Sequence, residues 1–148
     1  MGYRNVVVGT DGSETAELAV QHAAQLAGAF GARLTVVTAY TPGGGVSPQE
    51  LDEAPEDVRW RLVDASAAED LAGHAKALAR KAGVTDVQTR VAAGDPASAL
   101  IDVAEDTLAD VIVVGSKGMT GASRFVLGSV PNKVSHHAPC DVLIVQTA

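Results

Sequence analysis

The chain has 148 residues, 47% of them hydrophobic, which is enough for one domain with a substantial core. Its 11 basic and 18 acidic side chains give a formal net charge of -7, which argues against a broad electrostatic contact with nucleic acid. A single cysteine, Cys140, excludes an intrachain disulfide framework and suits a reducing compartment. Without a long apolar signal region or a run long enough to cross a membrane, we expect one cytoplasmic domain over residues 1–148, with no nucleic-acid or membrane partner.

The beginning of the chain predicts a strand, a helix and a second strand. NVVVGT, near residue 6, is apolar on consecutive positions, as is typical of a parallel strand covered on both faces. Ser13 is a suitable N-cap for a helix whose apolar residues recur at helical spacing from Ala16 to Phe30 and stop at Gly31. RLTVVTAY, near residue 36, predicts the second buried strand.

The middle of the chain predicts a loop, a long helix and a weaker strand. Residues 41–57, TPGGGVSPQELDEAPED, are rich in glycine, proline and acids, which indicates a mobile surface loop. Residues 57–82 carry leucine and alanine at helical spacing up to Gly83. DVQTRVAAG is more polar than the other runs and predicts a strand nearer the sheet edge.

The last part of the chain completes an alternating pattern. In GDPASALIDVAEDTLAD, Asp95 is a suitable N-cap and Pro96 suits the first helical position. DVIVVGS near residue 113 and DVLIVQT near residue 144 predict buried strands, separated by a short helix that starts at Ser129 and stops before Pro139. With right-handed crossovers, this alternation predicts an α/β fold: a doubly wound five-stranded parallel sheet with helices on both faces.

The stretch GSKGMTGASRFVLGS, residues 115–129, directly follows one of these strands, where doubly wound sheets bind ligands. Gly115 and Gly118 carry no side chain, so their amides can approach a ligand closely. Gly128 and Ser129 open a helix whose first amides are unpaired and carry the positive end of the helix dipole. The stretch therefore predicts an anion site. The alternative is a glycine-rich turn with an ordinary serine cap.

Two common nucleotide-binding motifs are missing. A Walker loop requires G-x-x-x-x-G-K-[ST], and neither Lys117 nor Lys133 follows a glycine in that frame. The first strand is followed by GTDGSE, which supplies Gly9 and Gly12 but not the G-x-G-x-x-G of a dinucleotide fold. A nicotinamide-dependent dehydrogenase is therefore disfavoured.

The segment HHAPC brings His136, His137 and Cys140 close together, which raises the question of zinc. A zinc site needs three or four converging ligands, and the chain has no C-x-x-C or second Cys/His pair to complete one. We interpret the two histidines as the end of a helix, where they suit the negative end of the dipole, and expect no metal site.

The pattern Gly115-x2-Gly118-x9-Gly128-Ser129 resembles the G-2x-G-9x-G-[ST] signature of ATP-binding universal stress proteins. The resemblance covers nearly the whole chain, from VVVGTDGSETA to GSVPNKVSHHAPCDVLIVQ. It implies a Rossmann-like sheet of strand order 3-2-1-4-5, with a cleft between the first and fourth strands for ATP or a related adenine nucleotide, with or without Mg²⁺. The chain departs from the family pattern at two positions. Many members have histidine in place of Lys117, and a residue with a backbone donor is more usual in place of Pro131.

The resemblance also implies a set of nucleotide-binding residues. Asp11 would accept hydrogen bonds from the ribose or adenine side, beside Gly9 and Thr10, and Ala39 would touch the adenine. The ribose and phosphates would be held by Gly115, Gly118, Gly128, Ser129 and Val130, and Ser116, Lys117 and Met119 complete the candidates. For Asp11 the residues themselves offer an alternative, a turn in which its side chain bonds the backbone ahead of Ser13.

Three functions follow from these observations. The first is a stress-response module that binds ATP and has little or no turnover. The second is a slow ATPase, but phosphoryl transfer needs metal-holding carboxylates, and near the glycine stretch the chain offers only Asp11, so we assign no catalytic residue. The third is a cyclic AMP-binding protein, because the glycine signature does not separate a cyclic monophosphate from a triphosphate.

The last predicted strand also indicates an oligomer. In the order 3-2-1-4-5 it lies at the sheet edge, yet DVLIVQT carries charge only at Asp141. An apolar edge with an unpaired ladder invites another chain. We therefore predict a homodimer in which this strand pairs with its own copy and buries Val142, Ile144 and Val145.

Overall fold

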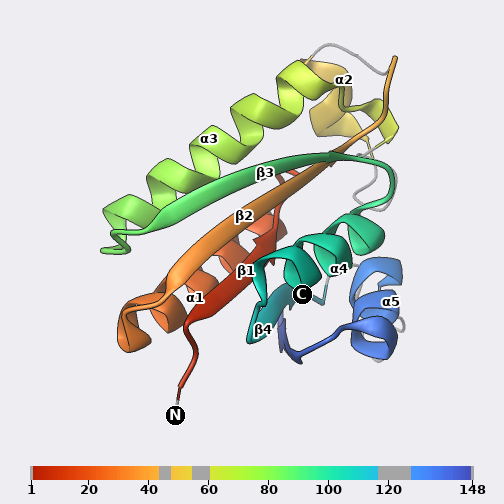
Figure 1. The fold of residues 1–148 in the computed structure, drawn as a ribbon. Helices are drawn as coiled ribbons and strands as arrows, with labels where there is room; N and C mark the ends of the chain where they lie inside the picture. The colour runs from red at the N-terminus through yellow and green to blue at the C-terminus, as the bar shows by residue number, and fades with distance from the viewer. Residues whose placement is uncertain (1, 44–47, 55–60, 117–127, 148) are drawn as a thin grey trace.

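A computed structural model describes residues 2–43, 48–54, 61–116 and 128–147. Within these residues, five parallel strands form one sheet in the order β3-β2-β1-β4-β5 (Figure 1). The predicted fold class and strand order are confirmed. The strands are β1 (Asn5–Gly9), β2 (Arg33–Tyr40), β3 (Val87–Ala93), β4 (Val111–Gly115) and β5 (Asp141–Val145).

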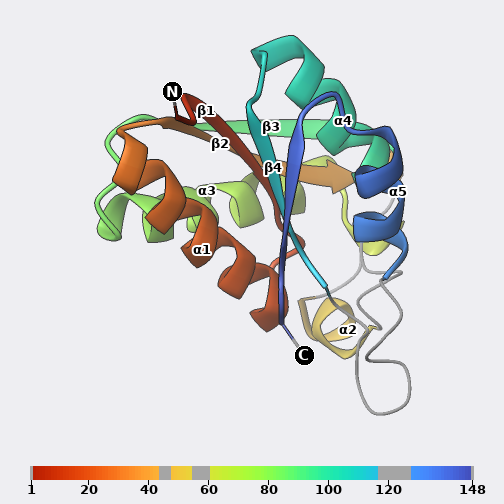
Figure 2. The ribbon, with the colours of Figure 1, turned by 90° about the horizontal axis from the view of Figure 1, so that it is seen from below.

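Helices cover both faces of the sheet. Helices α1 (Glu14–Phe30) and α3 (Ala65–Lys81) pack on one face, and α4 (Pro96–Thr107) and α5 (Ser129–His137) on the other (Figure 2). The predicted caps are confirmed. The Ser13 hydroxyl accepts from the Ala16 amide at 3.2 Å, and the Asp95 carboxylate from the Ser98 amide at 3.0 Å.

The core explains why the strands are apolar on consecutive positions. Successive side chains of a strand point to opposite faces, and here both faces are covered. In β1, Val6 and Val8 pack with α1 and α3, whereas Val7 between them packs with α4. All three are fully buried.

The long helix predicted for residues 57–82 is shorter than expected, because α3 begins only at Ala65. Asp64, in an extended conformation, caps the helix through a 2.8 Å hydrogen bond from the Ala67 amide. Just before it, Val63 is 1% exposed, and its carbonyl accepts from the Thr41 amide. The apolar spacing began at Leu62, but Val63 beside it packs into the core as part of a connection and not on a helix.

The surface loop predicted for residues 41–57 contains a short helix, α2 (Pro48–Glu53), which is a correction. Proline suits the first turn of a helix, since its missing N–H has no partner there. Four residues apart, Gln49 and Glu53 are joined by a 3.2 Å side-chain hydrogen bond. The glycine and proline content hid this local helical pattern.

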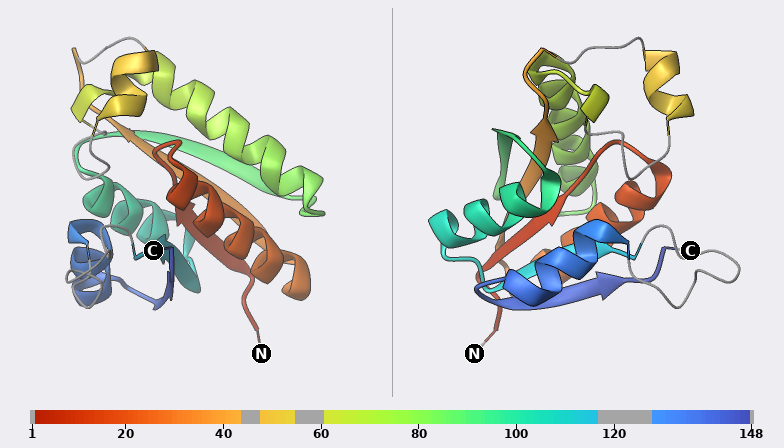
Figure 3. Two further views of the ribbon diagram at one scale, coloured as in Figure 1. Left: turned by 180° about the vertical axis from the view of Figure 1, so that it is seen from behind. Right: turned by 90° about the vertical axis from the view of Figure 1, so that its right-hand side faces the viewer.

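Strand β5 lies at one edge of the sheet and pairs with β4 alone among the described strands (Figure 3). Its side chains are unequally covered: Leu143 is 40% exposed, Val145 is 5% exposed, and Val142 and Ile144 are partly buried against the α5 face. In the segments that the structure describes, none of the helices is long and apolar enough to span a bilayer.

Candidate functional site

A cavity opens at the carboxyl ends of β1 and β4. In the sheet, β2 and β3 follow β1 on one side, whereas β4 and β5 follow it on the other side. The strand order therefore changes direction between β1 and β4. The space between the lining atoms, counted together with the open solvent at the mouth, is about 720 Å³. Its lining is mostly apolar, with a few polar groups at the ends of strands and helices. The lining residues are Gly9, Thr10, Asp11, Thr15, Ala16, Ala19, Val37, Ala39, Val63, Pro96, Leu100, Val114, Gly115 and Val130.

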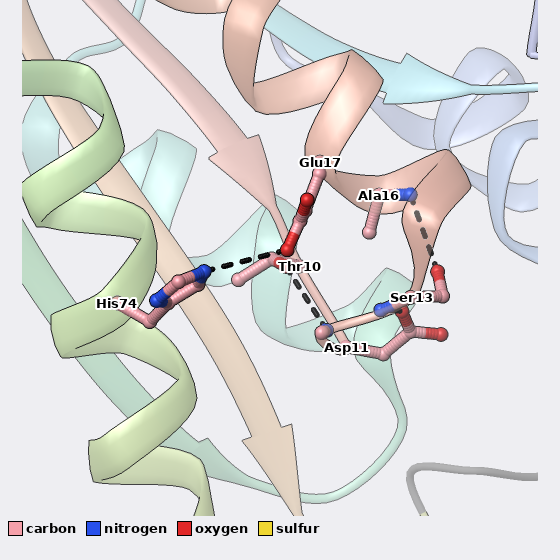
Figure 4. A network of polar contacts seen from close by, with 7 residues as sticks. Thr10, Asp11, Ser13, Ala16, Glu17 and His74 are labelled. Atoms are coloured by element: carbon pink, nitrogen blue, oxygen red, sulfur yellow. Dashed lines mark hydrogen bonds and ion pairs between the residues drawn. The ribbon is translucent and has the colours of Figure 1, made fainter. Parts of the chain in front are cut away.

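The turn between β1 and α1 forms the polar side of the cavity (Figure 4). Thr10 is held to the sheet by a 3.0 Å hydrogen bond from its amide to the Val37 carbonyl. Its hydroxyl accepts from the Gly12 amide at 3.1 Å. The Asp11 carboxylate accepts from the Ser13 amide at 2.9 Å, just ahead of the cap of α1.

Both interpretations of Asp11 therefore find support in the structure. One carboxylate oxygen bonds the backbone two residues on, as expected for a turn residue. The same residue lines the cavity at the end of β1. A carboxylate oxygen has more than one lone pair, so the turn does not exhaust its capacity to accept hydrogen bonds.

Gly12 is required in this turn for two reasons. Its φ of 81° lies in the left-handed region, where other residues are strained. A Cβ at this position would also lie 2.4 Å from the Leu71 Cδ2 of α3. Close by, the His74 Nε2 of α3 lies 3.4 Å from the Glu17 Oε1 of α1 (Figure 4). The turn thus lies against α3, and within it the Asp11 carboxylate is held by the Ser13 amide.

The other side of the cavity is reached by the first turn of α5. Gly128 occupies the N-cap position with no side-chain hydrogen bond, and the first turn contains no acidic residue. Helix N-termini with free amides attract anions, and the amides of Ser129 and Val130 belong to this turn. Of these residues only Val130 lines the cavity, whereas Ser129 is exposed.

At two glycines of the cavity lining, neighbouring side chains approach the backbone closely. A Cβ on Gly9 would lie 3.2 Å from the Leu100 side chain of α4. A Cβ on Gly115 would lie 3.1 Å from the Thr147 Cγ2. Neither Gly9 nor Gly115 has a positive φ. The two glycines therefore matter because neighbouring side chains approach them closely, and not because of the backbone conformation.

Ser116 is placed differently from the other candidates. It is 1% exposed, and it is not among the cavity-lining residues. Its hydroxyl donates to the Gln146 side-chain oxygen at 3.0 Å and accepts from the Thr147 amide at 3.1 Å. The side chain thus ties the end of β4 to the segment after β5.

The structure brings six predicted nucleotide-binding residues together around the cavity, and these are Gly9, Thr10, Asp11, Ala39, Gly115 and Val130. Gly128 and Ser129 directly precede Val130 in the chain, at the start of α5. Lys117, Gly118 and Met119 lie outside the described residues.

Sequence reasoning missed the contributions of the helices to the lining. Ala16 and Ala19 of α1 and Pro96 and Leu100 of α4 all face the cavity. In the sequence these residues belong to the apolar stripes that mark the buried side of each helix. The sequence does not distinguish a stripe residue that packs on the core from one that faces the cavity. Small residues at the first turn of α1 are the one signal that could have indicated space.

The histidines and the cysteine near the end of the chain lie away from the cavity lining. His136 and His137 are exposed in the last turn of α5, as predicted. Burial raises the pKa of the Cys140 thiol, helped by the Asp141 charge, which keeps it protonated and unreactive at neutral pH. Within the described parts of the chain, no three His, Cys, Asp or Glu side chains are grouped so as to hold a metal ion.

These features define a doubly wound α/β protein with an apolar cavity at its topological switch point. A sequence model of the universal stress protein family matches residues 2–146. The chain belongs to the universal stress protein family.

Two curated relatives agree with this assignment. A universal stress protein of Mycobacterium tuberculosis is 38% identical over 149 residues, which cover 98% of this chain and 97% of the relative. A putative universal stress protein of Staphylococcus aureus is 35% identical over 146 residues, covering 98% of this chain and 85% of the relative.

Solved structures show the same fold. A universal stress protein crystallised in complex with cAMP is 35% identical and superposes with a TM-score of 0.78, with each chain covered completely. A universal stress protein from Archaeoglobus fulgidus, 23% identical, superposes with a TM-score of 0.74 over 97% of this chain and 98% of its own.

Proposed function

We propose that the protein is a stress-response module of the cytoplasm that binds an adenine nucleotide, ATP in the first place, as one domain over residues 1–148. The observation that carries this proposal is the cavity at the ends of β1 and β4, which combines a mostly apolar lining with the polar turn after β1 and adjoins the first turn of α5. Asp11 offers an acceptor for hydroxyl or amino groups at one end. The first turn of α5 offers amides to phosphates near the other.

The interior of the cavity suits a flat aromatic ring. Val37 and Ala39 of β2, Val63 and Leu100 supply apolar surface from three sides, without a charged group among them. An adenine in this region would place its ribose toward Asp11 and the glycines at the strand ends. Any Mg²⁺ would enter with the phosphates, because the described residues contain no group of three acidic, histidine or cysteine side chains that could hold it.

A specific observation favours cyclic AMP as a second candidate. The universal stress protein that was crystallised with cAMP is 35% identical to this chain over its full length. The cavity supports a cyclic monophosphate as well as a triphosphate, since both present an adenine, a ribose and an anion. The two ligands differ in charge and in the room that the phosphates need.

Titration calorimetry of the nucleotide-stripped protein with ATP, ADP, AMP, cyclic AMP and adenosine tests the proposal. We expect saturable binding of ATP at one site per chain, and weaker binding of adenosine, because adenosine lacks the phosphates that α5 would hold. Guanosine triphosphate is the matched control for the base. Equal affinity for guanosine and adenine nucleotides, or no binding of either, would contradict an adenine site.

We expect hydrolysis to be far slower than the roughly 1 per second at the low end for enzymes. Phosphoryl transfer needs positioned carboxylates or a base, and the cavity lining contains the single acid Asp11. Phosphate release measured with ATP in excess checks this expectation. Many turnovers per second that copurify with the protein, and disappear in Asp11→Ala, would make it an enzyme.

The proposal includes a homodimer through β5. The strand is an edge of the sheet, and Leu143 near its middle is 40% exposed. Pairing β5 with its own copy would satisfy the unpaired ladder and cover this side chain, together with Val142 and Ile144. Val145 already lies in the core of one chain, so it would add little to such an interface.

A further inference from the structure

Lys133 connects the beginnings of the two helices that cover one face of the sheet. It lies in the second turn of α5, and its Nζ is 3.3 Å from the Asp95 Oδ2 and 2.9 Å from the Ser98 Oγ. Asp95 is the N-cap of α4, and Ser98 is in its first turn. The side chains of Lys133 and Asp95 are 46% and 39% exposed, respectively.

Both members of this ion pair adjoin the cavity without lining it. Pro96, the residue after Asp95, lines the cavity, and so does Val130, three residues before Lys133. Three residues of α-helix rise by about 4.5 Å, so the backbone of Lys133 lies less than one turn of α5 from Val130. An anion bound within roughly 8 Å of the two groups would feel both charges, since that is the screening length at physiological ionic strength.

Asp95 carries its negative charge at neutral pH. Partial burial acts to raise its pKa, but hydrogen bonds from Ser98 and from Lys133 outweigh this effect and lower the pKa below its usual value. The chain as a whole has a formal net charge of -7, which also opposes anion binding. Without a compensating cation, the Asp95 carboxylate would repel phosphates bound near Pro96.

We propose that Lys133 is a specificity-determining residue for phosphorylated ligands, because its ammonium group compensates the Asp95 carboxylate beside the cavity. This inference rests on the proposed nucleotide-binding function and concerns only the phosphate end of the ligand. An exposed ion pair contributes little to folding, so the effect is expected in ligand affinity and not in stability. A neutral nucleoside is the natural reference, since it has no charge for the pair to act on.

The direction in which two single substitutions change the Kd for ATP tests the inference. We expect Lys133→Met to raise the Kd for ATP by about three- to tenfold, the scale of one partly screened charge acting on several phosphate charges. Asp95→Asn should lower the Kd for ATP, because asparagine keeps the helix cap while Lys133 is left unneutralised. The Kd for adenosine should stay within about twofold in both variants, since adenosine is uncharged.

Two further variants are the controls. Lys133→Met combined with Asp95→Asn should restore the ATP affinity to within about twofold of the unmodified protein, because both charges are gone. Arg33→Met removes the same charge from an ion pair with Asp86 at the opposite end of the sheet, where the side chains are 52% and 45% exposed. This variant should leave the Kd for ATP unchanged.

Each contrary result has a distinct meaning. If both single variants weakened ATP and adenosine equally, the ion pair would act only as a tie between the helices, and the inference would be wrong. Unchanged ATP affinity in Lys133→Met would overturn it as well. If the unmodified protein bound neither ATP nor adenosine, the proposed function would fail and the inference with it.

Discussion

Replacing Asp11 with alanine is expected to weaken binding of ATP and of adenosine together by about 1.5–3 kcal/mol, the range for a hydrogen bond to a charged group. This corresponds to a rise in Kd of roughly 10- to 150-fold. The reason is its position: Asp11 lines the cavity at the end of β1, and the turn around it is fixed by Gly12 and Leu71. Calorimetric titration with both ligands measures the effect.

Two control variants separate the possible causes of such a loss. Asp11→Asn keeps an acceptor for the Ser13 amide, so it preserves the turn while removing the charge. Asp110→Ala removes a carboxylate that accepts from the Arg4 and Asn5 amides at the opposite end of β1, and it should leave nucleotide affinity unchanged. A loss for ATP but not for adenosine in Asp11→Ala would instead place Asp11 near the phosphates or a metal ion.

The strands could be predicted because burial on both faces leaves a direct mark on the sequence, whereas the order of the sheet was implied by the resemblance to universal stress proteins. Val6, Val7 and Val8 are consecutive and apolar only because helices cover both sides of β1. The caps at Ser13 and Asp95 were equally visible, since each is a polar residue that precedes an apolar helical stripe. The resemblance implied Asp11 and Ala39 as site residues, and both line the cavity at the ends of β1 and β2.

The parts that could not be predicted depend on contacts between distant segments. Ser116 stands in the glycine signature, but its hydroxyl is taken by Gln146 and Thr147, which lie 30 and 31 residues further along the chain. The late start of α3 depends on the packing of Val63 against the core. The ion pair of Lys133 with Asp95 spans 38 residues, and no local pattern marks either partner.

The glycine positions were informative because of packing around them, and not because of the backbone conformation of each glycine. Gly128 has a φ of -60°, which any residue adopts, so its backbone does not require glycine. At Gly9 and Gly115 the requirement comes from the Leu100 and Thr147 side chains packed against them. A sequence reveals that small residues recur at these positions, but the neighbour that excludes a larger one becomes known only in the fold.

Replacing Leu143 with lysine is expected to convert the proposed homodimer into a monomer. Leu143 is the central residue of β5, which runs from Asp141 to Val145. If the strand pairs antiparallel with its own copy over its full length, the two-fold axis places residue 143 opposite itself. Two lysines would then face each other directly, and like charges in that arrangement destabilise a pair of strands.

Leu143 is a better position for this test than Val145. Val145 is 5% exposed and belongs to the core beside α1, so a charge there would disturb the fold of a single chain. Leu143 is 40% exposed, so lysine can extend into solvent in the monomer. Circular dichroism and thermal unfolding of the variant check that the single chain keeps its fold.

Sedimentation velocity at micromolar concentration measures the outcome. We expect the unmodified protein to sediment as a dimer and Leu143→Lys as a folded monomer. Gln88→Lys is the matched control, because it adds the same charge to an exposed position of β3, the strand at the opposite edge of the sheet. An unmodified protein that sediments as a monomer would refute the dimer, whereas a dimer that persists in Leu143→Lys and dissociates in Gln88→Lys would place the interface on β3.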